Sequence, residues 1–145
     1  MGADKSKLPI RKEWISKLKS EFKKPNKEKE FYYIIWMINN EPIGHSNINK
    51  IDFGNSATMH LHLWKNERRK KGLGLDFLRQ TIPYYFKNFE LDTLICEPYS
   101  ENIAPNNVLK KLGFEFVREY ETTPGWINFY QTVNRYELKR EQTLQ

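Results

Sequence analysis

The sequence predicts an α/β fold of the α+β kind, in which helices flank a mixed, mostly antiparallel sheet of about six strands. The length of 145 residues and the hydrophobic share of 39% fit one packed domain spanning residues 1–145. Runs rich in β-branched and aromatic residues, separated by turn-forming residues, predict the strands. Apolar residues at helical spacing predict the helices. The charged ends, residues 1–8 and 139–145, are expected to be mobile.

The first predicted elements are a helix and a β-hairpin. The helical spacing is carried by Ile10, Trp14, Leu18 and Phe22. Pro25 follows this helix and marks its end. Phe31 to Ile38 is rich in strand-forming residues. Asn39-Asn40 is a hairpin turn signal and leads into a second strand, Ile43 to Ile51.

A third antiparallel strand is predicted from Ala57 to Trp64, after a turn at residues 52–55. Side chains alternate between the two faces of a strand, so His60 and His62 share one face and apolar residues share the other.

The C-terminal half predicts two more helices and three strands. A helix is expected from Leu75 to Phe89, and Pro83 should kink it or end its regular part. The other elements are a strand from Leu91 to Glu97, a short helix from Pro105 to Leu112, and two strands, Phe114 to Glu121 and Ile127 to Leu138. The predicted order is α-βββ-α-β-α-ββ.

A basic stretch with two glycines, Arg69-Lys70-Lys71-Gly72-Leu73-Gly74, lies between the third strand and the second helix. Glycines let the backbone turn tightly and approach a ligand closely. The start of a helix presents N–H groups and a partial positive charge, to which three adjacent cations add. These features predict a seat for phosphates, with a solvated turn as the alternative.

Two common phosphate-binding patterns do not fit this stretch. The sequence holds no Walker string, and a dinucleotide fingerprint would need a glycine where Phe77 stands. The pattern Arg-x-x-Gly-x-Gly between a strand and a helix resembles the acyl-CoA pyrophosphate loop of the GNAT acyltransferase superfamily.

A second stretch, Asn102 to Phe114, resembles the next motif of that superfamily: an Asn, a short amphipathic helix, then Lys-x-Gly-Phe. The matching positions are Asn102, Leu109, Lys111, Gly113 and Phe114. Both motifs come in the right order with a strand between them. The chain is therefore identified as a member of the GNAT superfamily of N-acetyltransferases over about residues 30–138.

The resemblance implies an acyl-CoA N-acyltransferase that moves an acetyl group from acetyl-CoA to a primary amine of a small molecule or peptide. It also implies one strand, and commonly a helix, ahead of the first predicted helix. Nothing before Pro9 could supply them. Either the first strand is absent, or a partner chain provides it, or the sequence is a truncated form.

Cofactor contacts are implied by the same resemblance. In the family, two strands splay apart at the middle of the sheet, and the pantetheine arm pairs with the backbone of the earlier strand. That edge maps to His62-Leu63-Trp64 here. The pyrophosphate would lie on Arg69 to Gly74, and Asn102 would bridge the splayed strand to the cofactor arm.

Catalysis requires a neutral amine, and deprotonating an alkylamine at pH 7 costs about 4 kcal/mol. Glu97 is the predicted base, because a related branch, the ribosomal-protein N-terminal acetyltransferases, carries a catalytic Glu at this spacing; an ordinary strand-end carboxylate is the alternative. The Tyr and Ser that serve as acids in the family fall on Leu109 and Pro105, which cannot donate a proton. Tyr99 is the predicted substitute, with Ser100 or water as alternatives.

His60 could join the proton path, because histidine titrates near the working pH. A structural role is the alternative for both His60 and His62. No metal is expected, because neither a Cys nor a third ligand cluster accompanies the pair.

The amino-acid composition limits the kinds of binding partner and the cellular location that can be expected. The formal net charge of +6 fits a phosphate loop and a solvated helix face, and nucleic-acid binding is a weaker alternative without a supporting motif. No apolar run approaches the roughly 18 residues of a membrane span, so no membrane partner is expected. With Cys96 as the single cysteine, we expect a cytoplasmic enzyme. A non-catalytic acyl-CoA-binding or regulatory module is the alternative. An open strand edge at Phe31 to Ile38 predicts a homodimer.

Overall fold

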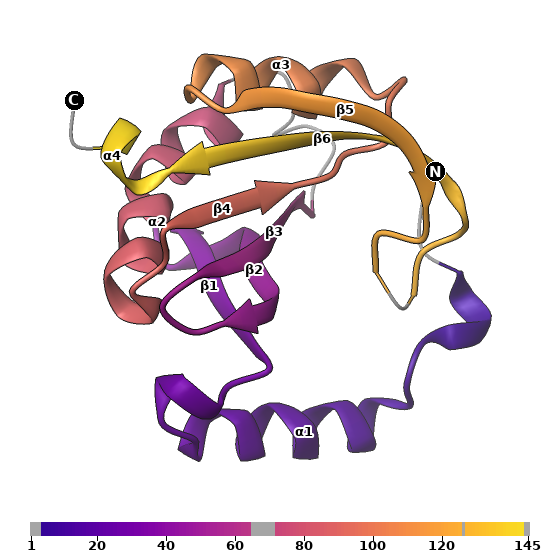
Figure 1. Ribbon diagram of the computed structural model, residues 1–145. Coiled ribbons are helices and arrows are strands. Elements are labelled where there is room, and N and C mark those ends of the chain that lie inside the picture. The colour runs from indigo at the N-terminus through magenta and orange to yellow at the C-terminus, as the bar shows by residue number, and fades with distance from the viewer. Residues whose placement is uncertain (1–3, 65–71, 126, 144–145) are drawn as a thin grey trace.

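The computed structural model describes residues 4–64, 72–125 and 127–143 (Figure 1). The strands are β1 (Phe31–Ile38), β2 (Glu41–Asp52), β3 (Ser56–Leu63), β4 (Thr93–Cys96), β5 (Glu115–Thr122) and β6 (Gln131–Lys139). The helices are α1 (Arg11–Lys23), α2 (Leu73–Phe89), α3 (Ile103–Lys111) and α4 (Arg140–Thr143), with 3-10 turns at Lys5–Lys7 and Asn26–Glu28. The predicted fold class and the predicted order of elements through β6 are confirmed.

The six strands form one sheet in the order β1-β2-β3-β4-β6-β5. Every neighbouring pair is antiparallel except β3 and β4, which run parallel from Ser56↔Thr93 to Met59↔Cys96. β3 continues beyond Met59 to Leu63, whereas the chain after Cys96 stays with β6. The amide of Asn134 donates to the Pro98 carbonyl at 3.0 Å, and the amide of Ser100 donates to the Thr132 carbonyl at 3.0 Å. The sheet therefore splits at its centre, between β3 and β4.

Local sequence explains the β1–β2 hairpin. Asn39 and Asn40 have positive φ angles of 49° and 63°, the left-handed conformation that a two-residue hairpin turn requires. Asn tolerates this conformation better than other side chains do. The turn fixes a register in which Phe31 faces Asn49 and Ile38 faces Glu41.

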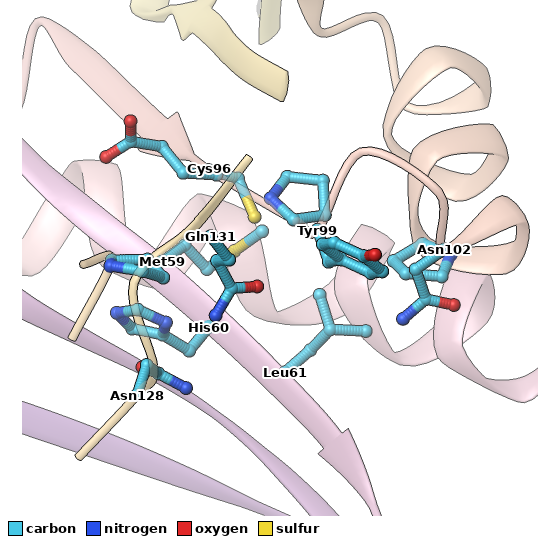
Figure 2. A pocket seen from close by; sticks show the side chains of 12 residues that line it. Met59, His60, Leu61, Cys96, Tyr99, Asn102, Asn128 and Gln131 are labelled. Carbon is cyan, nitrogen blue, oxygen red and sulfur yellow. The ribbon is translucent and has the colours of Figure 1, made fainter. Parts of the chain in front are cut away.

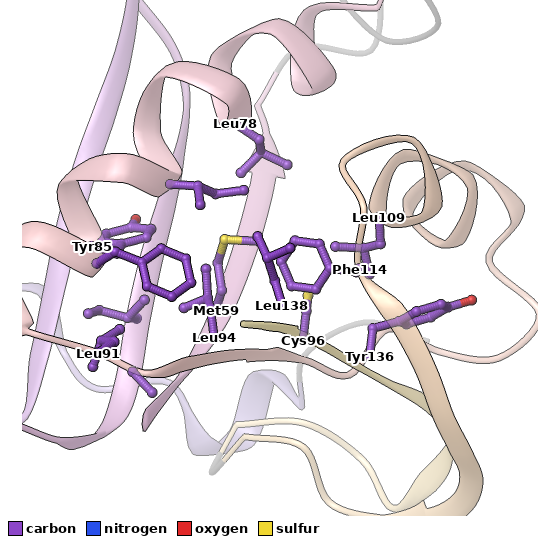
Figure 3. Packing of buried hydrophobic residues seen from close by; sticks show 14 of the residues in the cluster. Met59, Leu78, Tyr85, Leu91, Leu94, Cys96, Leu109, Phe114, Tyr136 and Leu138 are labelled. Carbon is purple, nitrogen blue, oxygen red and sulfur yellow. The ribbon is translucent and has the colours of Figure 1, made fainter. Parts of the chain in front are cut away.

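The hydrophobic core lies between one face of the sheet and helices α2 and α3 (Figure 3). Leu78 and Tyr85 from α2 and Leu109 from α3 are fully buried against the strands. The sheet side of this core includes Met59 and Leu94, also fully buried. The regular part of α2 does not end at Pro83, because the helix continues through the proline to Phe89.

Helix α1 lies on the other face of the sheet, near β1. The indole of Trp14 stacks on the ring of Phe31 with centroids 5.5 Å apart. The buried carboxylate of Glu21 accepts hydrogen bonds from the Glu30 amide at 3.0 Å and from the Lys24 ammonium. Burial raises the pKa of Glu21, but these hydrogen bonds outweigh burial and the net pKa is lowered. The α1 helix is thus attached to the start of β1 at both ends.

Both termini contact the domain within the described residues. The Asp4 amide donates to the Ile127 carbonyl, and Arg140 Nε of α4 donates to the Leu91 carbonyl at 2.6 Å. The predicted mobility of residues 1–8 and 139–145 is a statement about motion, which these contacts do not test, and it stays a prediction.

Candidate active site

A cavity of about 190 Å³ lies where β3 and β4 separate. Three segments line it (Figure 2). The first is Met59 to Leu61 of β3, and the second is Cys96 at the end of β4 with residues 97–99, Asn102 and Pro105 after it. The third is Pro124, Asn128 and Gln131 around the β5–β6 connection. The split in the sheet thus opens into a cavity that is walled by segments far apart in the sequence.

The backbone of β3 faces this split at alternate residues. The Trp64 amide donates to the Ile43 carbonyl of β2 at 2.9 Å. In an antiparallel strand, the backbone N–H and C=O groups of successive residues point to opposite edges of the strand. The backbone groups of His62 therefore point toward β2, like those of Trp64. The backbone groups of Leu61 and Leu63 point toward the split. The Trp64 amide is thus engaged within the sheet, and cofactor binding along the edge His62-Leu63-Trp64 stays a prediction. Leu63 keeps its predicted orientation, and Leu61 joins it.

The start of α2 has the geometry expected of a phosphate seat. Gly72 is left-handed, with a φ of 72°, and the first intrahelical bond runs from the Asp76 amide to its carbonyl at 3.1 Å. The amides of Leu73 and Gly74 precede that bond, and no side chain of the described residues caps the helix. A Cβ placed on Gly74 would meet no atom of the described residues within 4 Å. These donors suit a pyrophosphate; Arg69, Lys70 and Lys71 lie outside the described residues.

Glu97 lines the cavity at the end of β4 and is half-buried. Its carboxylate accepts a hydrogen bond from the hydroxyl of Tyr120, which reaches it from β5. The hydroxyl orients the carboxylate through this hydrogen bond. Sequence reasoning missed Tyr120, since nothing in a 23-residue separation signals the contact.

His60 lines the same cavity, and its Nε2 lies 3.0 Å from Asn49 Oδ1. Burial, and then the charges of Lys50 and His45, lower the pKa of His60 to about 4. The imidazole is therefore neutral at pH 7. With Nε2 donating its proton to Asn49, Nδ1 carries the lone pair. His60 is thus a hydrogen-bond acceptor rather than a proton donor.

Tyr99 also lines the cavity, and its hydroxyl donates to Glu101 Oε2 at 3.1 Å. That hydrogen bond, with the charge of Glu101, raises the pKa of Tyr99, so the phenol keeps its proton at neutral pH. Leu109 is fully buried in the core, and Pro105 lines the cavity without a donor group.

The segment from Tyr99 to Asn102 is held by a residue that sequence reasoning missed. The buried Asn106 donates from Nδ2 to the carbonyls of Tyr99 at 3.0 Å and Asn102 at 2.7 Å. Its Oδ1 accepts from Asn134 Nδ2 at 2.9 Å and from the Tyr136 hydroxyl at 3.0 Å. Asn106 therefore ties the predicted cofactor-bridging residue, Asn102, to β6. An Asn inside a predicted helix was the one available signal.

Residues 4–64, 72–125 and 127–143 contain neither a metal-ligand cluster nor a membrane-spanning helix. No group of three or more His, Cys, Asp or Glu side chains there could hold a metal ion. No helix in these segments is long and apolar enough to cross a membrane.

Comparison with known proteins decides the family. A family described as "Acetyltransferase (GNAT) domain" matches residues 5–115, more than half of the chain. The chain belongs to the GNAT acetyltransferase family. The predicted family is confirmed, and with it the enzyme class, acyl-CoA N-acyltransferase, and acetyl-CoA as acyl donor. No protein with a curated description matches the sequence significantly.

Solved structures show the same fold at low sequence identity. Spermidine N-acetyltransferase from Vibrio cholerae, in complex with CoA and spermine, is 16% identical, with a TM-score of 0.78 over 95% of this chain and 80% of that one. Mycobacterium smegmatis RimJ, in complex with CoA-disulfide, is 14% identical, with a TM-score of 0.77 over 92% and 64%. Aminoglycoside acetyltransferase AAC(6')-Ib, in complex with coenzyme A, is 18% identical, with a TM-score of 0.67 over 78% and 68%.

Proposed function

We propose that this enzyme transfers the acetyl group of acetyl-CoA to a primary amine of a small molecule or a peptide, in the cytoplasm. The observation that carries the proposal is the cavity at the β3–β4 split, which has a carboxylate in its wall and the backbone of a splayed strand along its side. The similar structures contain spermine in one case and kanamycin in another, and both compounds carry primary amines. They support the class of acceptor and not one particular acceptor.

The cofactor would be held mainly by backbone groups. Leu61 and Leu63 present theirs to the split, and the amides of Leu73 and Gly74 are placed for a pyrophosphate. Asn102 borders the cavity between these two regions. Bound acetyl-CoA supplies the acetyl group as a thioester.

Glu97 is the proposed base. An ammonium must lose one proton before its nitrogen can react, and the nitrogen loses a second as the amide forms. Tyr120 holds the carboxylate of Glu97 in place through its hydroxyl. One of the two protons ends on the departing thiolate and the other in solvent. Tyr99, which keeps its phenol proton, is the proposed donor to that sulfur.

The test is Glu97→Gln, which removes the base but keeps the size of the side chain. We expect kcat/KM to fall by about 10² to 10⁴ with an amine that the wild type acetylates, because that is the usual contribution of a general base. CoA affinity, measured by calorimetry, should stay within about twofold. Glu119→Gln, at an exposed position of β5, is the control and should change neither. A Glu97→Gln enzyme with full rate from about pH 6 to 9 would make Glu97 a structural residue only.

We also propose a homodimer through the edge of β1, the terminal strand of the sheet. The side chains of Ile35 and Met37 on this strand are 46% and 47% exposed. An open edge with apolar side chains pairs readily with a second strand. Sedimentation should show a species of twice 17.5 kDa, and Ile35→Lys should reduce it. A clean 17.5 kDa species at tens of micromolar protein would contradict the dimer.

A further inference from the structure

Helix α1 packs on the sheet with only part of its circumference. Trp14 stacks on Phe31, Glu21 is buried beside the start of β1, and Leu18 is half-buried. Successive residues of a helix are about 100° apart around its axis, so Trp14, Leu18 and Glu21 lie within about 60° of one another. Every other residue of α1 is exposed, and Figure 1 shows the helix along the outside of the domain. Most of the surface of α1 therefore faces solvent.

One side of this exposed surface combines cations with large apolar side chains. Helical spacing places six residues of α1 side by side in a strip about 120° wide, which we call the basic–apolar strip. In order around the helix they are Arg11, Phe22, Ile15, Lys19, Lys12 and Lys23. Phe22 and Ile15 are 73% and 39% exposed. The exposed acid of α1, Glu13, lies about 140° from the centre of the strip, so the strip holds four cations and no carboxylate.

The charges of the strip are not neutralised within the described residues. The ion pairs found there involve other side chains, and no carboxylate pairs with a cation of the strip. The chain just before α1 adds two exposed lysines, Lys5 and Lys7, and two exposed apolar residues, Leu8 and Ile10. Single exposed apolar residues are normal on a protein surface, whereas several that lie together among cations mark a site of interaction.

A nucleic acid and an acidic protein groove match this strip less well than a membrane surface does. A nucleic acid binds mainly through cations and would leave Phe22 and Ile15 in water. A groove that receives a helix needs apolar anchors at several positions of one face, but Trp14 and Leu18 are already packed toward the sheet. A lipid surface meets one side of a helix, with anionic headgroups for the cations and an acyl boundary for the apolar side chains.

We propose that the basic–apolar strip of α1 binds the surface of an anionic membrane. Phe22 and Ile15 enter the boundary between headgroups and acyl chains, and the four cations contact the anionic headgroups. The cytoplasmic leaflet carries such a negative charge, which agrees with the proposed cytoplasmic location. The sequence predicts no membrane span, and this peripheral contact requires none. The proposal goes beyond the proposed function and does not depend on the identity of the acceptor.

The binding test uses vesicles of phosphatidylcholine with about one third phosphatidylserine, and co-sedimentation as the readout. The wild type should bind these vesicles, should not bind pure phosphatidylcholine, and should be released as the ionic strength rises. Lys12→Gln/Lys19→Gln should weaken binding about 25-fold, because each cation near the surface contributes about fivefold. Lys110→Gln/Lys111→Gln, at exposed positions of α3, is the control with the same change in net charge and should bind like the wild type.

A second test asks whether Phe22 enters the lipid. Phe22→Ser should weaken vesicle binding about 10-fold or more, because a phenyl group then no longer leaves water. Tyr84→Ser, at an exposed position of α2, is the control and should have no effect. The single cysteine, Cys96, is buried, so a polarity-sensitive fluorophore can be attached selectively to Phe22→Cys. Its emission should shift to shorter wavelength with anionic vesicles, and that of the same label on Tyr84→Cys should not.

Three results would overturn the proposal. The first is a wild type that does not sediment with the anionic vesicles at low ionic strength. The second is an equal loss of binding in Lys12→Gln/Lys19→Gln and Lys110→Gln/Lys111→Gln, which would mean that net charge and not the strip is responsible. The third is full binding by Phe22→Ser with no spectral shift at Phe22→Cys, which would point to a nucleic acid or another polyanion. If a variant melts below the wild type, the wild-type series in lipid composition and ionic strength decides.

Discussion

Replacing Gly74 by alanine should stabilise the protein and weaken its binding of CoA. Gly74 is the second residue of α2, and its φ is not in the left-handed region. A Cβ built there meets no atom of the described residues within 4 Å, so these residues give no steric reason for glycine. Alanine in a helix is more favourable than glycine by about 0.5 to 1 kcal/mol. The added methyl group would occupy the open space that the phosphate seat needs.

The two effects have different sizes. One kcal/mol corresponds to about 2 to 4 °C in Tm for a domain of this size, so the Tm of the free protein should rise by about 1 to 4 °C. A lost hydrogen bond to a charged group costs about 1.5 to 3 kcal/mol, so CoA should bind about 10- to 100-fold more weakly. The stabilisation of the protein by saturating CoA should shrink accordingly.

Thermal melts with and without CoA, and calorimetry with CoA, measure both effects. Gly72→Ala is the informative control, because Gly72 has a φ of 72° and a non-glycine residue there is strained by about 1 to 2 kcal/mol. It should lower the Tm where Gly74→Ala raises it. A Gly74→Ala protein that melts below the wild type refutes the reasoning from open space. A Gly74→Ala protein that binds CoA as tightly as the wild type refutes the placement of the phosphate seat at the start of α2.

Two other predictions concern stability. Asn106→Leu should destabilise the protein on the order of 3 kcal/mol in urea unfolding, because it leaves the half-buried Asn134 amide and the buried Tyr136 hydroxyl without their acceptor. Asn107→Leu, at the next and exposed position of α3, should cost little, and equal costs would contradict the role of Asn106. For pH, the folded-state pKa of His60 is lowered to about 4 from 6.5. The unfolded chain then binds more protons, so the free energy of unfolding should be largest above pH 6.5 and fall as the pH drops toward 4, by at most about 3 kcal/mol from this group. The decrease in the free energy of unfolding toward acid pH should become smaller in His60→Gln and stay unchanged in His62→Gln.

The fold was largely readable from local sequence, because most of its elements are specified by their own residues. The β1–β2 hairpin is one case: Asn39 and Asn40 supply two left-handed residues, and the flanking runs supply the strands. Pro83 shows the limit of such reasoning. A proline removes one intrahelical hydrogen bond, but α2 continues past it because the surrounding residues Ile82, Tyr85 and Phe86 are buried in the core.

The site was predicted less completely, because its contacts join residues that are far apart in the sequence. The bond from the Tyr136 hydroxyl to Asn106 spans 30 residues, and that from the Tyr120 hydroxyl to Glu97 spans 23. No periodicity or spacing signals such pairs. The direction of the Trp64 amide is hidden from the sequence for a related reason. Which backbone groups face the split depends on the register between β2 and β3, and register is a property of two strands.

The charge of the two substrates explains why a buried, neutral histidine suits this site. CoA is an anion and an ammonium acceptor is a cation, yet both must reach one cavity of about 190 Å³. The net charge of +6 favours the first and opposes the second. Exposed charges are screened over about 8 Å at physiological ionic strength, so an acceptor in the cavity escapes that field only if the wall of the cavity holds no cation. Among the described residues that line the cavity, His60 is the one basic side chain, and its burial keeps it uncharged. The lowered pKa of His60 therefore favours the proposed ammonium acceptor, whereas a histidine with an ordinary pKa would be protonated in part of the population at neutral pH and would repel that acceptor.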